Sequence, residues 1–376
     1  MKICRKNNLI YLSSLITIYS TFFFSCNSKN GYYSVDTIKI VDKPYCGVSI
    51  KGDTLSSSFI EPQQMLSVDS ILIVLTGYNK HIVNILDCAT DSIICSFGEI
   101  GHAQNEFTNY PQNMYLKNDT RTGDRLLYIS DNNTITHILN IEKSINERIC
   151  HIDSVIKHVI SDNGEKTIYC LNDSNMLCYY GITYEDPRDK IFYPPYWVEM
   201  RQNESLECHP YPHVISTPSY GVMRAAYETK SRISPNTGYL VSMMRFVDFI
   251  CLYNIETKKT IGITTTDTYD FSLFDKEEDV NKVVNQIQIF NIDVAATDDY
   301  IYLLKTKSSF KELVQREEEG IYDFPSYLHI YNWDGELRNI YQLDPGTINI
   351  CYNKSLETLY CINAYGHLIK YNLSKQ

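Results

Sequence analysis

The stretch Cys95–Pro111 reads CSFGEIGHAQNEFTNYP, and it contains the end of one predicted strand, a turn and the approach to the next strand. Alternating apolar residues end at Phe97, and Gly98 and Gly101 permit the positive φ of a tight turn. No helix pattern follows these glycines, so they do not form the phosphate-binding loop that opens a helix. The stretch therefore predicts a joint between two β-sheets.

Four predicted strands precede this joint, and all of them lie within about 35 residues. They cover residues 64–68, 71–75, 81–86 and 93–97. Small and polar residues separate them, as turns require. This spacing is typical of a four-stranded antiparallel sheet, the blade of a propeller.

The pattern recurs along the chain, which predicts an array of repeated β-units. The next four units cover residues 113–150, 158–193, 222–263 and 287–341, and each again offers four strands. A sixth unit, residues 347–373, is one strand short. The unpartnered strand Val35–Val41 supplies the missing member, which pairs both chain ends and removes two open sheet edges.

The predicted fold is therefore all-β, a six-bladed β-propeller over residues 34–376 whose ring is closed by an N-terminal strand that completes the last blade. A pair of stacked sheets is the alternative. It fits less well because its strands would not group in fours.

The composition agrees with a β-rich globular protein. Apolar residues make up 44% of the 376 residues and charged residues 21%, and the 31 tyrosines favour strands. The formal net charge is −11; without the three basic residues of the first 25 positions, 31 basic face 45 acidic residues, a net charge of −14. No basic cluster lies outside that segment, so we expect no nucleic-acid partner.

The first 25 residues predict an export signal. A basic start is followed by an apolar run over residues 9–24, which is short for a membrane-spanning helix. Ser25-Cys26 at its end resembles the bacterial lipobox, although Phe23-Phe24 departs from the usual leucine and small residue. We expect lipidation of Cys26 followed by a tether over residues 26–33, with membrane attachment through the lipid only. An ordinary signal peptide or an anchor helix is the alternative.

Ten cysteines remain beyond Cys4 and Cys26. Most lie within apolar runs and are expected to be small buried hydrophobic residues. Three pairs flank predicted hairpins and leave a cross-strand disulfide open: Cys88 and Cys95, Cys170 and Cys178, and Cys351 and Cys361. No Cys-x-x-Cys occurs, so neither a zinc knuckle nor a redox pair is supported.

Several stretches resemble known propeller families. Phe97-Gly-x-x-Gly101 followed by Glu106-Phe107 is similar to the inter-blade signature of NHL-type repeats, without their usual extra glycines. Residues 293–302 and 327–344 look like the later blades of the TolB-like six-bladed propeller lipoproteins of anaerobic bacteria, and Ile233–Gly238 resembles a turn of such propellers. The resemblance covers most of the chain after the tether. It implies the fold and a cell-envelope location, and no catalytic residues.

The start of the expected mature chain bears on the side of the membrane. Residues 26–30 lack the acidic run that accompanies surface export in related lipoproteins. We therefore expect a lipid-anchored protein of the outer membrane that faces the periplasm.

Known catalytic motifs are absent from the sequence. It contains no Gly-x-Ser-x-Gly, phosphate-binding loop, His-Glu-x-x-His or calcium-loop pattern. His209 and His213 form the best metal-like pair, but the prolines between them prevent the helix that would place both on one face. The charge runs at residues 275–279 and 316–319 are typical of solvated surfaces. We expect no cofactor and no metal ion.

Four long connections are predicted on one face of the ring, at residues 99–110, 194–213, 265–285 and 305–326. They hold aromatic residues that we predict to form a binding face: Tyr193, Tyr196, Trp197, Tyr211, Tyr269, Phe271, Phe274, Tyr322 and Phe324. The alternative is that these rings pack the connections onto the blades. A short helix is predicted over residues 310–319, with Ser308 or Ser309 as its N-cap.

These features predict a non-catalytic, lipid-anchored propeller of the cell envelope that binds a partner protein or a glycan at its loop-rich face. One alternative is a propeller enzyme, a lyase or hydrolase with its site in the central channel, for which His158 and Arg224 are the candidates. Another is a purely structural subunit of an envelope complex.

Overall fold

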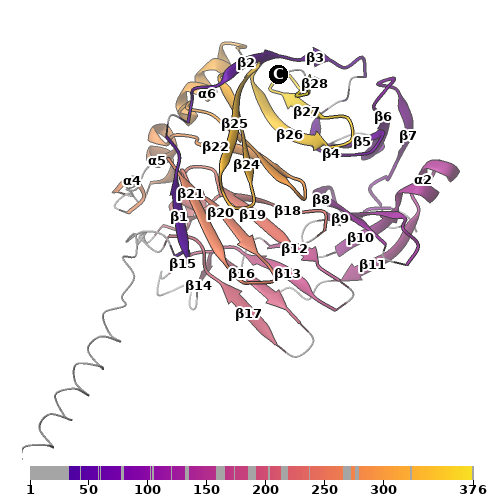
Figure 1. Cartoon of the computed structure of the whole chain (residues 1–376), viewed down its shortest axis with the longest axis horizontal. Helices are drawn as coiled ribbons and strands as arrows, with labels where there is room; N and C mark the ends of the chain where they lie inside the picture. The colour runs from indigo at the N-terminus through magenta and orange to yellow at the C-terminus, as the bar shows by residue number, and fades with distance from the viewer. Residues whose placement is uncertain are drawn as a thin grey trace, which may run out of the picture.

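Six β-sheets surround a common axis in the computed structural model, and each is one blade of a propeller (Figure 1). The structure describes residues 34–374, apart from residues 43, 58, 60, 78–79, 102, 104–105, 120, 132–134, 158–165, 173, 185–191, 202–203, 213–218, 237, 266–271, 276–278 and 322–323. No helix within this part of the chain is long and apolar enough to cross a membrane. The predicted all-β, six-bladed ring is confirmed.

In blades one to three the strands follow one another outward from the axis in sequence order. Their bounds are β4 Pro62–Val68, β5 Ile71–Thr76, β6 Val83–Asp87 and β7 Ile93–Phe97; β8 Pro111–Asn118, β9 Arg125–Asp131, β10 Ile135–Asn140 and β11 Ile152–Lys157; and β12 Lys166–Cys170, β13 Met176–Tyr180, β16 Tyr196–Met200 and β17 Ser205–Cys208. A separate hairpin, β14 Thr183–Tyr184 and β15 Phe192–Tyr193, lies between β13 and β16.

Blades four to six each gain a strand from the N-terminal part of the chain. Their bounds are β18 Thr229–Ile233, β19 Tyr239–Met244, β20 Ile250–Asn254 and β21 Thr260–Thr264, with β1 Thr37–Ile40; β22 Asn291–Ala296, β23 Tyr300–Lys305, β24 Ser326–Asn332 and β25 Leu337–Asp344, with β2 Val48–Lys51; and β26 Thr347–Asn353, β27 Thr358–Asn363 and β28 Leu368–Asn372, with β3 Asp53–Thr54.

The core lies between neighbouring blades. A second strand such as β5 is buried along its whole length, because the side chains on both of its faces contact an adjacent blade. Separate apolar clusters fill the spaces between blades one and two, four and five, five and six, and six and one. A further cluster continues from blade two through blades three and four to the helices that follow them.

The two faces of the ring differ in their connections. Links between the first and second strands and between the third and fourth strands lie on one face, which we call the hairpin face. The links between blades and those between second and third strands lie on the other, the loop face. Helix α2, Ile141–Glu147, lies in a link of the hairpin face between β10 and β11.

A recurrent turn shapes the hairpin face. The carboxylate of Asp87 accepts hydrogen bonds from the N–H groups two and three residues later, and the side chain of Asn254 does the same. The fourth residue after each, Asp91 or Lys258, has a φ of 54° or 62°. Because the side chain satisfies the backbone locally, these turns stay short.

The N-terminal strap, residues 34–55, crosses the outer edges of blades four, five and six (indigo in Figure 1). β1 pairs with β21 and β2 with β25, both in parallel, and β3 pairs antiparallel with β28. The carboxylate of Asp36 fixes the start of the strap by accepting hydrogen bonds from the N–H and hydroxyl of Thr260, at 2.8 and 2.9 Å. One segment thereby ties three blades together.

Closure of the ring by an N-terminal strand is confirmed, but the strand that completes blade six is Asp53–Thr54 and not Val35–Val41. Val35–Val41 contains β1, which lies on blade four, because the strap adds a parallel edge strand to two blades before it reaches the sixth. The strand expected at the start of the predicted unit 222–263 is wrong, since residues 220–226 form a helix. The strand expected at the start of the predicted unit 158–193 lies outside the described residues.

A four-residue motif opens four of the innermost strands. It reads Pro62-Gln-Gln-Met65, Pro111-Gln-Asn-Met114, Asn291-Ile-Asp-Val294 and Thr347-Ile-Asn-Ile350. In each copy the register shifts between the first and third residues, as in a β-bulge. Gln64 Oε1 accepts a hydrogen bond from the N–H of Met114 at 3.2 Å, and Asp293 Oδ2 accepts one from the N–H of Ile350 at 2.9 Å. The third residue of one motif thus holds the fourth residue of the next.

Polar contacts also join the other neighbouring innermost strands, and together they make what we call the inner ring. The further links are Tyr115 with Cys170 at 2.8 Å, Tyr169 with the carbonyl of Ser231 at 2.9 Å, Lys230 and Arg232 with Asp293 at 3.3 and 3.7 Å, and Asn353 with Ser67 at 2.7 Å. Asp293 is fully buried and contributes to two of the six blade-to-blade contacts. Its carboxylate connects blades four, five and six.

Replacing this carboxylate tests its role. Asp293→Asn keeps the size of the side chain but leaves Lys230 and Arg232 without their counter-charge, so we expect the free energy of unfolding in urea to fall by about 2 kcal/mol. The matched control is Asp299→Asn, because Asp299 pairs with Lys354 on the exposed surface. The control is expected to unfold like the wild type. Equal urea midpoints for Asp293→Asn and the wild type would contradict the assigned role.

Candidate functional site

Four helices gather on the loop face over blades three to five. α3, Tyr220–Ala226, leads into blade four; α4, Ser272–Asp275, and α5, Val280–Gln286, lead into blade five; and α6, Phe310–Glu318, joins β23 to β24. α5 contacts both α3 and α6, and α3 also contacts α4. Figure 1 shows α4, α5 and α6 together at one edge of the ring.

The helix predicted over residues 310–319 is confirmed as α6. Ser309 is its N-cap: its hydroxyl accepts a hydrogen bond from the N–H of Glu312, whose carboxylate accepts one in return from the N–H of Ser309. This capping box satisfies two backbone donors at the start of a short helix.

α3 occupies a stretch for which the sequence predicted a strand. The side chain of Ser219 caps it, and Val222, Met223 and Ala226 are buried against the core. Apolar residues at positions one, two and five of a segment share one helical face. This spacing after a serine is the signal that identifies the helix in the sequence.

A cavity of about 540 Å³, here called the α3 cavity, lies between α3 and the start of β18. Tyr220 and Arg224 line it from α3, Thr229 and Lys230 from β18, and Tyr179 from the end of β13. Its volume falls in the range of roughly 300–1,000 Å³ that is usual for small-molecule sites. Because β18 is an innermost strand, the cavity lies at the loop-face end of the central channel.

Three charged side chains line the α3 cavity, Arg224, Glu228 and Lys230. The carboxylate of Glu228 is 2.7 Å from the guanidinium of Arg245, and Lys230 Nζ is 3.3 Å from Asp293. The carboxylate and the ammonium group of the lining are therefore held by ion pairs.

Four of the nine aromatic residues predicted as a binding face are core residues. Trp197, Tyr211, Phe274 and Phe324 have exposed fractions of 1, 0, 0 and 7%. The indole N–H of Trp197 donates to the hydroxyl of Tyr211 at 3.1 Å, and that hydroxyl lies 2.5 Å from the hydroxyl of Ser242 in blade four. Trp197 belongs to strand β16, and the other three rings pack connections onto the blades, which was the alternative. None of the four is exposed to a ligand.

Two of the remaining rings reach the surface. Tyr193 is 39% exposed at the end of the β14–β15 hairpin, and the half-buried Tyr196 stacks between Tyr180 and His209. The other three, Tyr269, Phe271 and Tyr322, lie outside the described residues. The aromatic set therefore does not form one continuous face among the residues that are described.

The predicted connection Pro194–His213 is not a loop, because β16 and β17 pass through it. The run Tyr196-Trp-Val-Glu-Met200 consists largely of residues that favour strands. The connections beside it hold β14 and β15, between β13 and β16, and α3, between β17 and β18. The other three predicted connections are confirmed.

The remaining candidates are the channel residues His158 and Arg224 and the metal-like pair His209 and His213. Arg224 lines the α3 cavity, whereas His158 and His213 lie outside the described residues. His209 lies 3.0 Å from the carboxylate of Glu207. No group of three or more possible metal ligands occurs in the described part of the chain.

The central channel is narrow. A cavity of about 80 Å³ is bordered by the innermost strands of blades one, two, four, five and six. This volume is small against the 300–1,000 Å³, roughly, of small-molecule sites. Arg232, the charged residue on its wall, is held by Asp293. These properties disfavour a lyase or hydrolase site in the channel.

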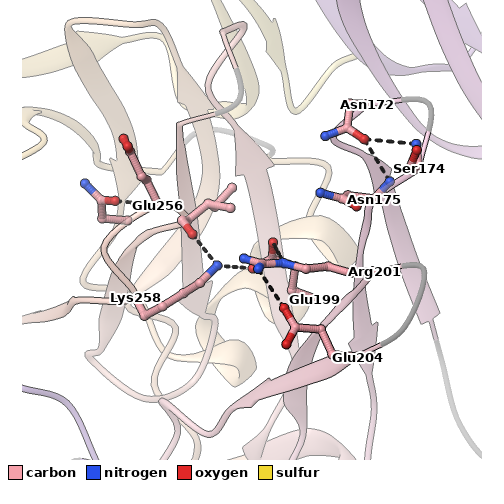
Figure 2. Close-up of polar contacts among 10 residues, drawn as sticks. Asn172, Ser174, Asn175, Glu199, Arg201, Glu204, Glu256 and Lys258 are labelled. Carbon is pink, nitrogen blue, oxygen red and sulfur yellow. Dashed lines mark hydrogen bonds and ion pairs between the residues drawn. The ribbon is translucent and has the colours of Figure 1, made fainter.

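A second charged cluster joins blades three and four on the side of the hairpin face. Figure 2 shows Arg201 and Lys258 converging on the carboxylate of Glu199, with Glu204 bound to the far side of Arg201. Burial would raise the pKa of the Glu199 carboxyl, but the hydrogen bonds from Lys258 and Arg201 outweigh it and hold the pKa below its ordinary value. Each charge in this cluster has a partner, so the cluster has a structural role and holds blades three and four together.

A third cluster is buried beneath the strap between blades four and five. Lys305 Nζ lies 2.5 Å from Asp248 Oδ1 and donates to Asn291 at 3.1 Å, and both charged side chains are 1% exposed. His329 Nε2 donates to the carbonyl of Pro44 in the strap at 2.5 Å, so Nδ1 accepts from the hydroxyl of Tyr331 at 2.9 Å. The strap thus covers a polar group that water does not reach.

None of the ten described cysteines forms a disulfide. Cys88 and Cys95 belong to apolar clusters on opposite faces of blade one, and Cys351 and Cys361 to clusters on opposite faces of blade six. The third pair is out of register, since Cys170 faces Met176 across its hairpin. A position beside a hairpin turn therefore does not bring the sulfur atoms together.

Solved structures match this chain over most of its length. A member of the duf4221 family from Bacteroides vulgatus is 11% identical, with a TM-score of 0.53, and the match covers 91% of this chain and 98% of that one. A protein from Bacteroides fragilis whose name describes it as exported is also 11% identical, with a TM-score of 0.47 over 89% of this chain and 84% of that one. No family model and no curated protein matches. The comparisons show the six-bladed fold, and the resemblance to TolB-like and NHL-type families is not confirmed beyond it.

The buried imidazole of His329 makes stability depend on pH. Burial, and then the positive charge of Lys305, lower the pKa of His329 from its ordinary 6.5 to about 3. Below about pH 6.5 the imidazole is therefore protonated in the unfolded chain and stays neutral in the folded protein. Because of this difference, the free energy of unfolding falls by ~1.4 kcal/mol for each unit by which the pH is lowered.

His329→Gln removes this titration while it keeps a hydrogen-bonding side chain. Urea unfolding of both proteins at pH 7, 6 and 5 measures the difference. The stability of the wild type is expected to fall more steeply than that of the variant as the pH falls. Parallel profiles for the two proteins would show that His329 carries no such coupling.

Proposed function

We propose that this protein is a non-catalytic binding protein of the cell envelope, held at the membrane by a lipid on Cys26, and that it binds a partner protein or a glycan through the loop face of blades three to five. The observation that carries the proposal is that helices α3, α4, α5 and α6 gather on this face and expose apolar side chains there. The α3 cavity, of about 540 Å³, opens beside the first of these helices.

Exposed apolar side chains on the loop-face helices support a macromolecular partner. Tyr220 on α3, Val280 on α5, Val314 on α6 and Ile321 just after α6 are 41, 36, 37 and 43% exposed. A Cβ atom on Gly221 of α3 would lie 3.5 Å from Val280, so α3 and α5 share this surface. Apolar side chains among charged ones are typical of interface patches.

The course of the strap favours a binding surface that points away from the membrane. β21 ends at the loop face, and β1 runs parallel to it, so the strap starts at the hairpin-face end, where Asp36 binds Thr260. The tether of residues 26–33 spans at most ~28 Å when extended. A lipid on Cys26 would therefore keep the hairpin face near the bilayer and leave the loop face accessible.

Capture from envelope extract tests the loop face. The double variant Val314→Lys and Ile321→Lys places two charges on exposed apolar positions, which costs the fold little but opposes burial at an interface. We expect this variant to lose most of the captured protein or glycan, measured by pull-down with a glycan array in parallel.

The matched control is Leu356→Lys, because Leu356 is 41% exposed on the hairpin face. It is expected to retain full capture. If the loop-face variant retains full capture, or if the hairpin-face control loses it, the binding surface is elsewhere.

The lipid anchor has a separate test. Cys26→Ala removes the thiol that would carry the lipid, so we expect the protein to move from the membrane fraction to the soluble envelope fraction. Unchanged retention in the membrane fraction would exclude lipidation at this residue.

A further inference from the structure

We propose that blade three carries a binding site for monovalent copper, Cu(I), made by the thiolate of Cys178 and the thioethers of Met176 and Met200. Met176 and Cys178 belong to β13, and Met200 is the last residue of the neighbouring strand β16. The site goes beyond the proposed function and lies away from the loop-face helices.

Two of the three sulfur atoms are already neighbours. Cys178 Sγ lies 3.6 Å from Met200 Sδ, across β13 and β16. A metal ion bound about 2.3 Å from each of two sulfur atoms, at a tetrahedral or trigonal angle, holds them roughly 3.8–4.0 Å apart. A movement of a few tenths of an ångström therefore lets both sulfur atoms bind one ion. The thiol of Cys178 releases its proton to solvent as the metal binds.

The sheet register places Met176 beside this pair. Met176 lies directly opposite Met200, and Cys178 follows Met176 two residues later in the same strand. Residues paired across an antiparallel sheet point to one face, as do residues two apart along a strand. Cys170 lies opposite Met176 on β12 and extends the row of sulfur-bearing residues to a third strand.

This sulfur-bearing face of blade three is turned toward blade two. Trp197 occupies the other face, where the hydroxyl of Tyr211 connects its indole to Ser242 of blade four. Met200, at the end of β16, is 38% exposed. The thioether of Met200 therefore gives a metal ion a route from solvent to the buried Cys178.

A cavity of about 500 Å³ adjoins the row between blades two and three. Tyr128, Ile138 and Ser154 line it from blade two, and Asn172 lines it from the hairpin between β12 and β13. Cys170 and Met176 are the strand ends that this hairpin connects. The cavity therefore leaves space for Met176 to change rotamer and turn its sulfur toward an ion.

The ligand set selects a soft ion of single charge. One thiolate and two neutral thioethers balance the charge of Cu(I), whereas Zn²⁺ would leave an uncompensated positive charge in a largely buried site. Zinc also takes its ligands from cysteine, histidine and carboxylate side chains. The described residues form no group of three of these types, so binding here depends on methionine sulfur.

Titration of the reduced protein with Cu(I), without oxygen and with bicinchoninic acid as competing ligand, tests the site. We expect one Cu(I) per chain to be held against the competitor, with a thiolate-to-copper charge-transfer absorption in the ultraviolet. Met200→Leu keeps the volume of an exposed side chain, so we expect an unchanged urea midpoint and Cu(I) binding weakened by at least about tenfold. Cys178→Ser is expected to abolish the charge-transfer absorption.

The matched control is Cys46→Ser, because Cys46 is an exposed thiol in the strap. It is expected to bind Cu(I) like the wild type. Failure of the wild type to hold Cu(I) against the competitor, equal affinity of the wild type and Met200→Leu, or an equal loss in the Cys46→Ser control would each overturn the inference. Displacement of bound Cu(I) by equimolar Zn²⁺ would overturn the assignment to a soft monovalent ion.

Discussion

The buried carboxylate of Asp293 is the contact on which the closed ring most depends. It accepts the N–H of Ile350 in blade six and pairs with Lys230 and Arg232 of blade four, so one side chain of blade five holds both neighbours. A propeller blade has no hydrogen bonds to the next blade within its own ladder, and apolar packing between blades is not directional. Polar contacts between the innermost strands fix the orientation of each blade relative to the next. At the outer edge, the strap joins blades four, five and six by pairing with a strand of each.

The contacts that hold the ring lie at the inner and outer edges of the blades. The connections between strands can therefore differ in length and structure from blade to blade. On the hairpin face, side chains such as Asp87 and Asn254 close short turns on themselves, and the Glu199 cluster pins blades three and four. On the loop face the connections of blades three to five lengthen into helices α3 to α6, and the α3 cavity opens beside the first of these. Recognition on this fold is therefore expected where the connections are long, because their residues do not set the ring.

Much of the ring followed from the sequence, because alternating apolar runs with short turns give the same signal in each blade. β5, buried on both faces, was predicted over residues 71–75 and observed over Ile71–Thr76. The strap could not be placed, since a lone alternating strand such as Val35–Val41 does not say which edge it joins. α3 was missed because Val222–Tyr227 is a short, largely apolar run, and such a run does not distinguish a strand from a buried helix. Aromatic residues in a predicted loop, such as Tyr211, gave no signal of burial, which depends on tertiary packing. The sequence also contains the repeat Pro62–Met65 and Pro111–Met114, which marks the start of two innermost strands and did not enter the prediction.

We propose that a rigid ring presents a binding surface on the loop face of blades three to five. Hydrogen exchange of the purified protein, with and without the envelope fraction that it captures, tests this most directly. We expect added protection to be confined to residues 220–230, 280–286 and 310–321, while the hairpin-face turns at 87–92 and 254–259 exchange as before. Protection of those turns, with no change on the loop face, would contradict it.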